Sequence, residues 1–369
     1  MEPRGPICLE AGSSILEASN GCPPGVPVLD AAVLPGLCNA HLHVLDAVLA
    51  EHGEDLVLEK LVSQPHGLKY RLLQAAAPER LVSAAASVLE ELRRGGTVYA
   101  ISYAEMGWLG AAAVEEASRI AGLPVGVAAQ PMEKRPAEYL ALAERYGLGL
   151  DTPFDLEPQL LREAASRARG PGLHVHVSED PALAAMGDYL LVEGSGAAGA
   201  VHLTHLGPGE ARLLAEEGTV PIYCPVSNYY HMGALPDPRG LLQLYLEGLP
   251  AGLGSDNAAW LPVDTRLLVS TSYLLLRPLL GPGPSPLLAR VLLYAATVGC
   301  TARFAPSEGL LVLRVPLLGY TGDPAVTVAK RMALSAVVYS SPSSRFSSSS
   351  AAESSSSPSS LEAGTDSMG

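Results

Sequence analysis

From residue 37 onward the chain alternates short apolar runs with segments of helical periodicity, and this cadence constrains the fold more than any other feature of the sequence. Counting each apolar run as a strand gives eight strand-helix units. The expected strands are residues 37–43, 97–103, 124–129, 147–151, 173–178, 199–204, 220–224 and 251–256. Eight such units predict an α/β fold, a TIM-type (β/α)8 barrel, because an open sheet would leave edges that need other cover.

Helical periodicity fills most of the gaps between these strands. The clearest helical segments are residues 78–94, 111–121, 136–146, 156–169 and 210–217. The chain has 369 residues, of which 48% are hydrophobic and 17% charged. That length suits one barrel with small additions, and that composition supports a sizeable core.

Short segments at both ends of the expected barrel (residues 35–305) predict a small additional sheet. Residues 1–34 contain strand-like runs at 7–9 and 14–16, and residues 306–340 contain two more at 310–315 and 332–339. From residue 341 to 369 the chain is rich in serine, with almost no large apolar side chain to offset the entropy of ordering. We expect this tail to be disordered.

Charge and cysteine content exclude several classes of protein. A formal net charge of −14 argues against a nucleic-acid polymer as partner, since phosphate binding needs a basic surface. The five cysteines are odd in number and form no C-x-x-C pair, so we expect no disulfide framework and no zinc finger. They are Cys8, Cys22, Cys38, Cys224 and Cys300. With no signal peptide or membrane span visible, the expected location is the cytoplasm, and a homo-oligomer stays open.

Six of the nine histidines stand in three short segments at the ends of expected strands. The first segment contains His41 and His43. Residues two apart on a strand point to the same face, so these imidazoles can hold one ion from one side, with Asn39 and Leu37 expected below them on that face. A lone H-x-H is a weak signal, and a pair of core or surface histidines remains the alternative.

The fifth strand adds a histidine followed by a carboxylate. His174, His176 and Ser178 share one face of the expected strand, and Glu179 follows where the strand becomes a loop. A histidine ligand with an acid three residues later places that acid beside a metal-bound water without making it a ligand. The alternative is a loop glutamate in solvent.

The sixth and eighth strands supply the remaining candidates. His202 is the better candidate on the sixth strand, whereas His205 suits a helix-packing role. Asp256 ends the eighth strand and is expected to be the last ligand. Its alternative role as a helix N-cap is weakened because the next helix begins only near Pro262.

Three imidazoles and one carboxylate suit a single Zn²⁺ or Fe²⁺ ion, and the absence of cysteine ligands argues against a closed structural zinc site. We therefore expect the ion to keep one coordination position open for a water molecule. The ion would lower the pKa of that water and supply hydroxide at neutral pH. Asp256 would accept the proton of the water, and Glu179 would carry protons to the substrate.

These segments together resemble the amidohydrolase superfamily, in its cytosine deaminase, guanine deaminase and chlorohydrolase branch. The stretch Leu34-Pro35-Gly36-Leu37-Cys38-Asn39-Ala40-His41-Leu42-His43 is similar to the first-strand signature of that family. The motifs that follow in the family's order are H-x-x-E at 176–179, His202, Cys-Pro-Val-Ser-Asn at 224–228 and Gly-Ser-Asp at 254–256.

The resemblance implies a role for each of these residues. The implied metal ligands are His41, His43, His176 and Asp256. The implied catalytic residues are Glu179 as proton shuttle, His202 as the polarising group and Asp256 as base. The family fold also includes a small β-sandwich, which residues 1–34 and 306–340 would form.

The lysines indicate how many ions bind. Binuclear members of the superfamily carry a bridging lysine at the end of the fourth strand, where this chain has Leu-Gly-Leu-Asp at 148–151. Lysine occurs only at positions 60, 69, 134 and 330, so a single ion is expected, with Lys134 as a reserve candidate.

The resemblance implies a metal-dependent hydrolase acting on carbon–nitrogen bonds other than peptide bonds. The leading reaction is hydrolytic deamination of a purine- or pyrimidine-like heterocyclic amine by metal-bound hydroxide. The alternatives are hydrolysis of cyclic amide C–N or C–Cl bonds, and a non-catalytic metal-binding barrel, which the presence of both acids opposes. Expected substrate-binding residues are Gln130, His174, His205 and Asn228, with loop residues His66, Lys69, Glu133 and His231 as further guesses.

Overall fold

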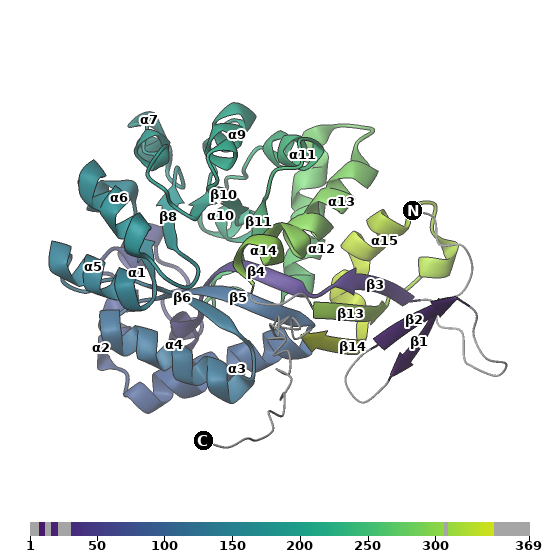
Figure 1. The fold of residues 1–369 in the computed structure, drawn as a ribbon, viewed down its shortest axis with the longest axis horizontal. Coiled ribbons are helices and arrows are strands. Elements are labelled where there is room, and N and C mark those ends of the chain that lie inside the picture. Colours follow the sequence, from purple (N-terminus) through teal and green to yellow (C-terminus); the bar gives the residue numbers. More distant parts are fainter. Residues whose placement is uncertain (1–6, 12–15, 21–30, 306–308, 343–369) are drawn as a thin grey trace, which may run out of the picture.

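The structure is a computed structural model that describes residues 7–11, 16–20, 31–305 and 309–342, and most of these residues form one barrel (Figure 1). Nine parallel strand segments follow one another in the order β11-β10-β9-β8-β7-β6-β5-β4-β12. Helices lie outside this ring. The predicted α/β class and the (β/α)8 barrel are confirmed.

Every predicted barrel strand is present, with ends within two residues of the predicted range. The strands are β4 (Leu37–His43), β5 (Thr97–Ala104), β6 (Val125–Ala129), β7 (Gly147–Leu150), β8 (Leu173–Val177), β9 (Gly199–His202), β10 (Val220–Tyr223), β11 (Gly252–Leu253) and β12 (Asp256–Asn257). The last two segments are halves of the eighth strand.

The broken eighth strand closes the barrel. Its first half pairs with β10, where Gly252 lies opposite Ile222, and its second half pairs with β4, where Asp256 lies opposite Leu42. The break falls at Gly254 and Ser255. A Cβ at position 254 would lie 2.6 Å from His41 Cβ, so only glycine fits there without displacing its neighbour.

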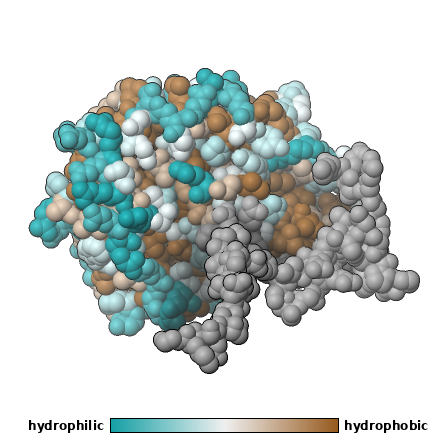
Figure 2. Space-filling model, viewed as in Figure 1, coloured by the Kyte–Doolittle hydropathy of each residue, from teal (hydrophilic) through white to brown (hydrophobic). Residues whose placement is uncertain are grey.

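Helices surround the barrel with their apolar faces turned inward. The larger ones are α3 (Pro78–Arg94), α4 (Gly107–Ala121), α5 (Pro136–Arg145), α6 (Pro158–Arg167), α9 (Pro208–Glu216), α10 (Pro225–Met232), α11 (Pro238–Leu246), α12 (Thr265–Leu276) and α13 (Ser285–Ala295). In α3, Leu81, Ala85, Leu89 and Leu92 are buried at intervals of three and four residues, which is one face of a helix. Hydrophilic side chains are spread over the outer surface on the face that Figure 2 shows.

An irregularity in β4 turns the two histidines of this strand inward. Leu37 and Leu42 pack in the larger core between strands and helices, whereas Cys38 and Ala40 pack in a second core inside the barrel. Leu37 and Leu42 are five residues apart, yet both side chains lie on the outer face of the strand. The inward–outward alternation of side chains along β4 is therefore interrupted between them. The pairing with β5 is irregular between Asn39 and Leu42, as in a β-bulge, which re-aims side chains. The prediction that Leu37 shares a face with the histidines is therefore wrong.

The segments at both ends of the chain form additional antiparallel sheets beside the barrel. One sheet contains β3 (Ala31–Pro35), β13 (Gly309–Arg314) and β14 (Ala336–Pro342), and a separate pair contains β1 (Ile7–Ala11) and β2 (Leu16–Asn20). These sheets fit the expected small β-sandwich. The division at residues 34, 305 and 340 stays a prediction, and the serine-rich tail from 343 onward lies outside the described residues.

Two cysteines form a disulfide, contrary to expectation. Cys38 in β4 is bonded to Cys300 in α14 (Val298–Phe304), 262 residues further along the chain. The partners meet because the amino end of β4 lies against the chain before α14, where the Cys38 backbone N–H donates to the carbonyl oxygen of Ala296. Cys224 is buried and free.

One stretch, Ser285–Phe304, has the length and hydropathy of a membrane-spanning helix, but 56% of its most apolar window is buried inside the protein. It covers α13 and α14, which pack against α15 (Pro324–Arg331), α11 and β4. This packing is that of a core helix in a barrel.

Substituting Gly254 by alanine tests the closure of the barrel. The added Cβ would meet His41 Cβ and the Sγ atom of Cys224, at 2.6 and 2.9 Å, so we expect the free energy of unfolding to fall by about 1–3 kcal/mol in urea denaturation. Gly209→Ala is the matched control, because a Cβ there meets no atom within 4 Å. Since alanine favours helix more than glycine does, this variant should be more stable by up to about 1 kcal/mol. Equal stability of the two variants would contradict the packing described.

Candidate metal centre

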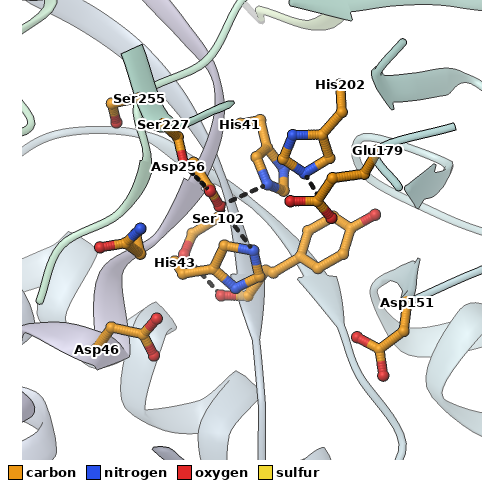
Figure 3. Close-up of polar contacts among 12 residues, drawn as sticks. His41, His43, Asp46, Ser102, Asp151, Glu179, His202, Ser227, Ser255 and Asp256 are labelled. Carbon is orange, nitrogen blue, oxygen red and sulfur yellow. Dashed lines mark hydrogen bonds and ion pairs between the residues drawn. The ribbon is translucent and has the colours of Figure 1, made fainter. Parts of the chain in front are cut away.

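Side chains from four strand ends converge at one rim of the barrel. The Nε2 atoms of His41 and His43 each lie 3.3 Å from Oδ1 of Asp256. The ring centroid of His176 lies 5.0 Å from that of His41 and 4.8 Å from that of His202. Figure 3 shows His41, His43 and Asp256 turned toward one another. These residues come from β4, β8, β9 and β12, at the carboxyl ends where barrel enzymes carry their chemistry.

Left-handed backbone occurs just after β8, at the last residue of β9 and at the first residue of β12. The φ angle is +49° at Ser178, +78° at His202 and +68° at Asp256. Such a conformation costs a non-glycine residue about 1–3 kcal/mol and is found mainly at functional sites. Asp188 holds the first of these turns by accepting both the backbone N–H and the hydroxyl of Ser178. Three strained residues therefore lie where side chains are delivered to the centre.

The donor set fits a divalent metal ion. His41 Nε2 and His176 Nε2 are buried and have no hydrogen-bond partner among the described residues. Two of the three groups of described side chains with ligand atoms within 4.8 Å of one another contain His41: one with His176 and His202, the other with His43 and Asp256. Imidazole nitrogens with a carboxylate oxygen suit Zn²⁺ and Fe²⁺.

Electrostatics leaves His41, His176 and Asp256 in the forms that bind metal. Burial lowers the pKa of His41 to about 3 and that of His176 well below its usual value, so both rings are neutral at pH 7. Burial alone would raise the pKa of Asp256, but His41, His43 and His202 hold it well below its usual value. Neutral imidazole and ionised carboxylate are the ligand forms that a metal requires.

Glu179 and His202 face each other beside the proposed ligands. Glu179 Oε2 lies 3.6 Å from His202 Nε2, and the glutamate side chain is 24% exposed. Burial raises the pKa of the Glu179 carboxyl. The amide nitrogen of Asn228, which is buried, lies 3.1 Å from Nδ1 of the same histidine. Ser227 donates its hydroxyl to Asp256. The residues expected to be catalytic are thus brought together, and Asn228 joins them.

A buried charged cluster behind His43 was missed by sequence reasoning. Glu105, which follows β5, has Oε1 2.5 Å from His43 Nδ1. Lys69, in α2 (Leu68–Ala75), lies 2.6 Å from Glu105 and 3.0 Å from Asp46. The expectation that Lys69 contacts substrate from a loop is therefore wrong, because its side chain is only 5% exposed. The position of Glu105 after a barrel strand was the signal that could have identified it.

Gln130 lies near the mouth, but both polar ends of its side chain are engaged. Tyr70 donates its hydroxyl to Gln130 Oε1 at 3.0 Å, and Gln130 Nε2 donates to Asp151 Oδ1 at 2.5 Å. The carboxyl that reaches the open side of the barrel is that of Asp151, whose side chain is 33% exposed and which Figure 3 shows on the side of Glu179. Asp151 was missed as a candidate for substrate contact.

Two predicted substrate-binding histidines do not reach the cluster. His174 is buried one layer deeper in the barrel, with Nε2 3.2 Å from the carbonyl oxygen of Pro171 and its ring against Phe304. His205 is exposed on the loop after β9, where its backbone N–H donates to Ser178. Both predictions of substrate contact are wrong. His174 lies two residues before His176 on β8 and so points into the barrel interior, and the turn after His202 places His205 on the outer surface.

Of the remaining guesses, His231 lies beside the cluster: it is in α10, three residues after Asn228, and the charges of Asp256 and His202 act on its pKa. His66 and Glu133 are exposed. His231 Nε2 lies 2.8 Å from the side-chain amide nitrogen of Asn257, and the histidine is half-buried. Lys134, the reserve lysine, pairs with Asp155 at 2.7 Å on the rim.

Comparison with known proteins identifies sequence relatives, although no family model matches the chain. A 5-methylthioadenosine/S-adenosylhomocysteine deaminase from Pelotomaculum thermopropionicum is 28% identical over 284 residues, which cover 68% of this chain and 64% of that protein. The protein of the same name from Halobacterium salinarum is 27% identical over 289 residues, covering 69% and 65%. The chain thus spans less than two thirds of the length of these curated relatives.

Solved structures share the fold. An adenosine deaminase from Xanthomonas campestris with bound zinc superposes with a TM-score of 0.66 at 21% identity, covering 82% of this chain and 77% of that one. A guanine deaminase from C. acetobutylicum with bound guanine has a TM-score of 0.67 at 13% identity, covering 88% and 90%.

The burial of His174 predicts a pH dependence of stability. Burial lowers the pKa of His174 to about 4, so the folded ring stays neutral while the unfolded ring binds a proton below its usual pKa of 6.5. As the pH falls from 6.5 toward 4, wild type should therefore lose about 1.4 kcal/mol of unfolding free energy per pH unit relative to His174→Gln, whose side chain does not titrate. Urea denaturation of the metal-free proteins measures this difference. A difference that does not change with pH would place His174 in solvent.

Proposed function

We propose, from its resemblance to the amidohydrolase superfamily in motifs, fold and sequence relatives, that the chain is a metal-dependent hydrolase acting on carbon–nitrogen bonds other than peptide bonds. The reaction that we propose is the hydrolytic deamination of a purine- or pyrimidine-like heterocyclic amine. The observation that carries this proposal is the half-buried Glu179 carboxyl beside a set of histidines that share Asp256.

The proposed ligands of one divalent ion, Zn²⁺ or Fe²⁺, are His41, His43, His176 and Asp256. When bound, such an ion acts as a Lewis acid and lowers the pKa of a coordinated water toward neutrality. The related adenosine deaminase structure contains zinc. A single ion is proposed because no lysine stands at the end of β7, where the chain continues from Leu150 to Asp151.

The two acids have different protonation tendencies, which suits different roles. Because burial raises the pKa of Glu179, its carboxyl holds a proton more readily than an exposed glutamate does and can give it to a ring nitrogen of the substrate. Asp256 remains ionised and can accept a proton from the attacking water. The partial exposure of Glu179 lets protons move between the site and solvent.

Asn228 determines the role proposed for His202. With the amide N–H of Asn228 donated to Nδ1, the ring of His202 carries its own proton on Nε2, facing Glu179. A protonated Nε2 is a hydrogen-bond donor and not a ligand. We therefore assign His202 to holding the oxygen that adds to the substrate carbon, while Asn228 sets its orientation.

The substrate is proposed to be a small heterocycle that enters past Asp151 and Glu179, with no nucleic-acid polymer and no membrane as partner. The chain is proposed to work in the cytoplasm, although the Cys38–Cys300 bond removes one of the two reasons for that location.

A second candidate is hydrolysis of a cyclic amide C–N bond or of a C–Cl bond. One observation favours the latter: an atrazine chlorohydrolase from Arthrobacter aurescens complexed with zinc shares the fold with a TM-score of 0.62 at 20% identity, covering 81% of this chain and 80% of that one. A non-catalytic metal-binding barrel is the alternative of another class, and the placement of Glu179 beside His202 opposes it.

Ammonia release from a panel of aminated purines and pyrimidines tests the proposed function. We expect turnover of at least one compound, and we expect Glu179→Gln to lower kcat/KM by about 10²–10⁴-fold while the metal content is retained, because the lost group moves protons and is not a ligand. Glu133→Gln, an exposed carboxyl on the same rim, is the control and should keep full activity.

Three outcomes separate the candidates. Turnover of a cyclic amide or a chlorinated heterocycle, with no ammonia from any amine, would replace the deaminase by the second candidate. No turnover of any compound, together with a metal content that His176→Ala leaves unchanged, would favour the non-catalytic barrel. Loss of metal in His176→Ala but not in His205→Ala supports the assigned ligands.

A further inference from the structure

We propose that Glu105, held in place by Lys69 and Asp46, is a positioning residue that keeps His43 in its metal-binding tautomer. The inference rests on the proposed metal centre and adds to it residues that touch neither metal nor substrate. It concerns Nδ1 of His43, the ring nitrogen that faces Glu105 and not Asp256.

The cluster is buried and closely connected. Glu105 and Asp46 have no exposed side-chain surface, and Lys69 has 5%. Glu105 Oε1 lies 2.5 Å from His43 Nδ1 and 2.6 Å from Lys69 Nζ. Two buried carboxylates are costly unless they are paired, so this arrangement needs the ammonium group that lies between them.

The distances assign the protons. Lys69 Nζ lies 2.6 Å from Glu105, 3.0 Å from Asp46 and 3.2 Å from His43 Nδ1. The ammonium protons therefore go to the two carboxylates, which are the nearer and charged acceptors. His43 Nδ1 then donates its own proton to Glu105, which leaves Nε2 with a free lone pair toward Asp256 and the proposed ion.

Without the Glu105 carboxylate the opposite tautomer would be favoured. Lys69 would then be free to donate to His43 Nδ1, which would place the ring proton on Nε2 and block the ligand atom. Glu105 thus decides which nitrogen faces the centre, and Lys69 supplies the charge that keeps Glu105 in the barrel.

The same geometry explains why a lysine lies there. The ligand atoms of His43, Asp46 and Glu105 approach one another closely enough to hold a cation. The Lys69 ammonium lies within 3.2 Å of all three groups and so occupies that position. The chain thereby neutralises this cluster with its own cation, beside a centre proposed to hold one ion.

The backbone around Glu105 fixes its position. Met106 has a φ of +70°, and the N–H of Gly107 donates to the carbonyl oxygen of Gln130 at 3.0 Å. Gly110 in α4 packs so closely that a Cβ there would lie 1.5 Å from the Glu105 carbonyl oxygen. The carboxylate therefore projects from a rigid turn, as a positioning group requires.

Zinc affinity measured by competition with a chromophoric chelator tests the proposal. Glu105→Gln keeps the shape of the side chain and removes its charge, and we expect its zinc Kd to rise 10–100-fold. Glu138→Gln is the matched control: its half-buried carboxylate accepts the backbone N–H groups of Met132 and Glu133 and touches no proposed ligand. Its zinc Kd should equal that of wild type.

The outcomes distinguish this inference from the proposed function. If wild type binds neither Zn²⁺ nor Fe²⁺, both fail. If wild type and Glu105→Gln bind zinc equally tightly, the inference alone fails, even where the variant melts at a lower temperature, because a merely structural role would change stability and not affinity.

If Glu105→Gln does not fold, a measurement on the wild-type protein still tests the proposal. Long-range ¹H–¹⁵N correlations of the histidine rings in the metal-free protein, assigned with His43→Asn, report the tautomer directly. We expect a proton on Nδ1 of His43, and a ring with a proton on Nε2 and none on Nδ1 would overturn the proposal.

Discussion

The pairing of β12 with β4 is the interaction on which the rest of the site depends. It sets Asp256 opposite Leu42, and so brings one carboxylate oxygen to 3.3 Å from both His41 and His43, more than 200 residues away in the chain. The pairing needs a broken eighth strand and a glycine at position 254, because a side chain there would displace His41. Closing the barrel and assembling the ligand set are therefore one structural event.

Buried charges are distributed on two sides of His43. On one side lie Asp256 and neutral imidazoles, which suit a divalent ion. On the other side lie two carboxylates that Lys69 neutralises. His43 joins the two sides, since one ring nitrogen faces Asp256 and the other faces Glu105. The centre therefore depends on groups that a list of ligands would leave out.

The sequence predicted the parts of the fold that follow from local periodicity. All eight barrel strands and helix α3 were located from apolar spacing, because those patterns reflect which face each residue buries. The convergence of His41, His43, His176 and Asp256 also followed, since the carboxyl ends of barrel strands meet at one rim.

What the sequence could not predict depends on contacts between distant segments or on irregular backbone. The interrupted alternation in β4 arises from its pairing with β5, and it misled the placement of Leu37. The Cys38–Cys300 bond joins residues 262 positions apart, and no local pattern reports such a pair. Glu105 and Lys69 have no motif of their own, and they acquire a role only when α2 packs against Val44–Leu49, the segment that follows β4.

X-ray absorption at the zinc edge of the zinc-loaded protein tests the central claim most directly, because it reports the ligands of the ion. The account predicts only nitrogen and oxygen ligands, at about 2.0–2.2 Å, with the scattering pattern of imidazole rings. A sulfur shell at about 2.3 Å, which would implicate the buried Cys224, or a second metal at about 3.5–4 Å would contradict it.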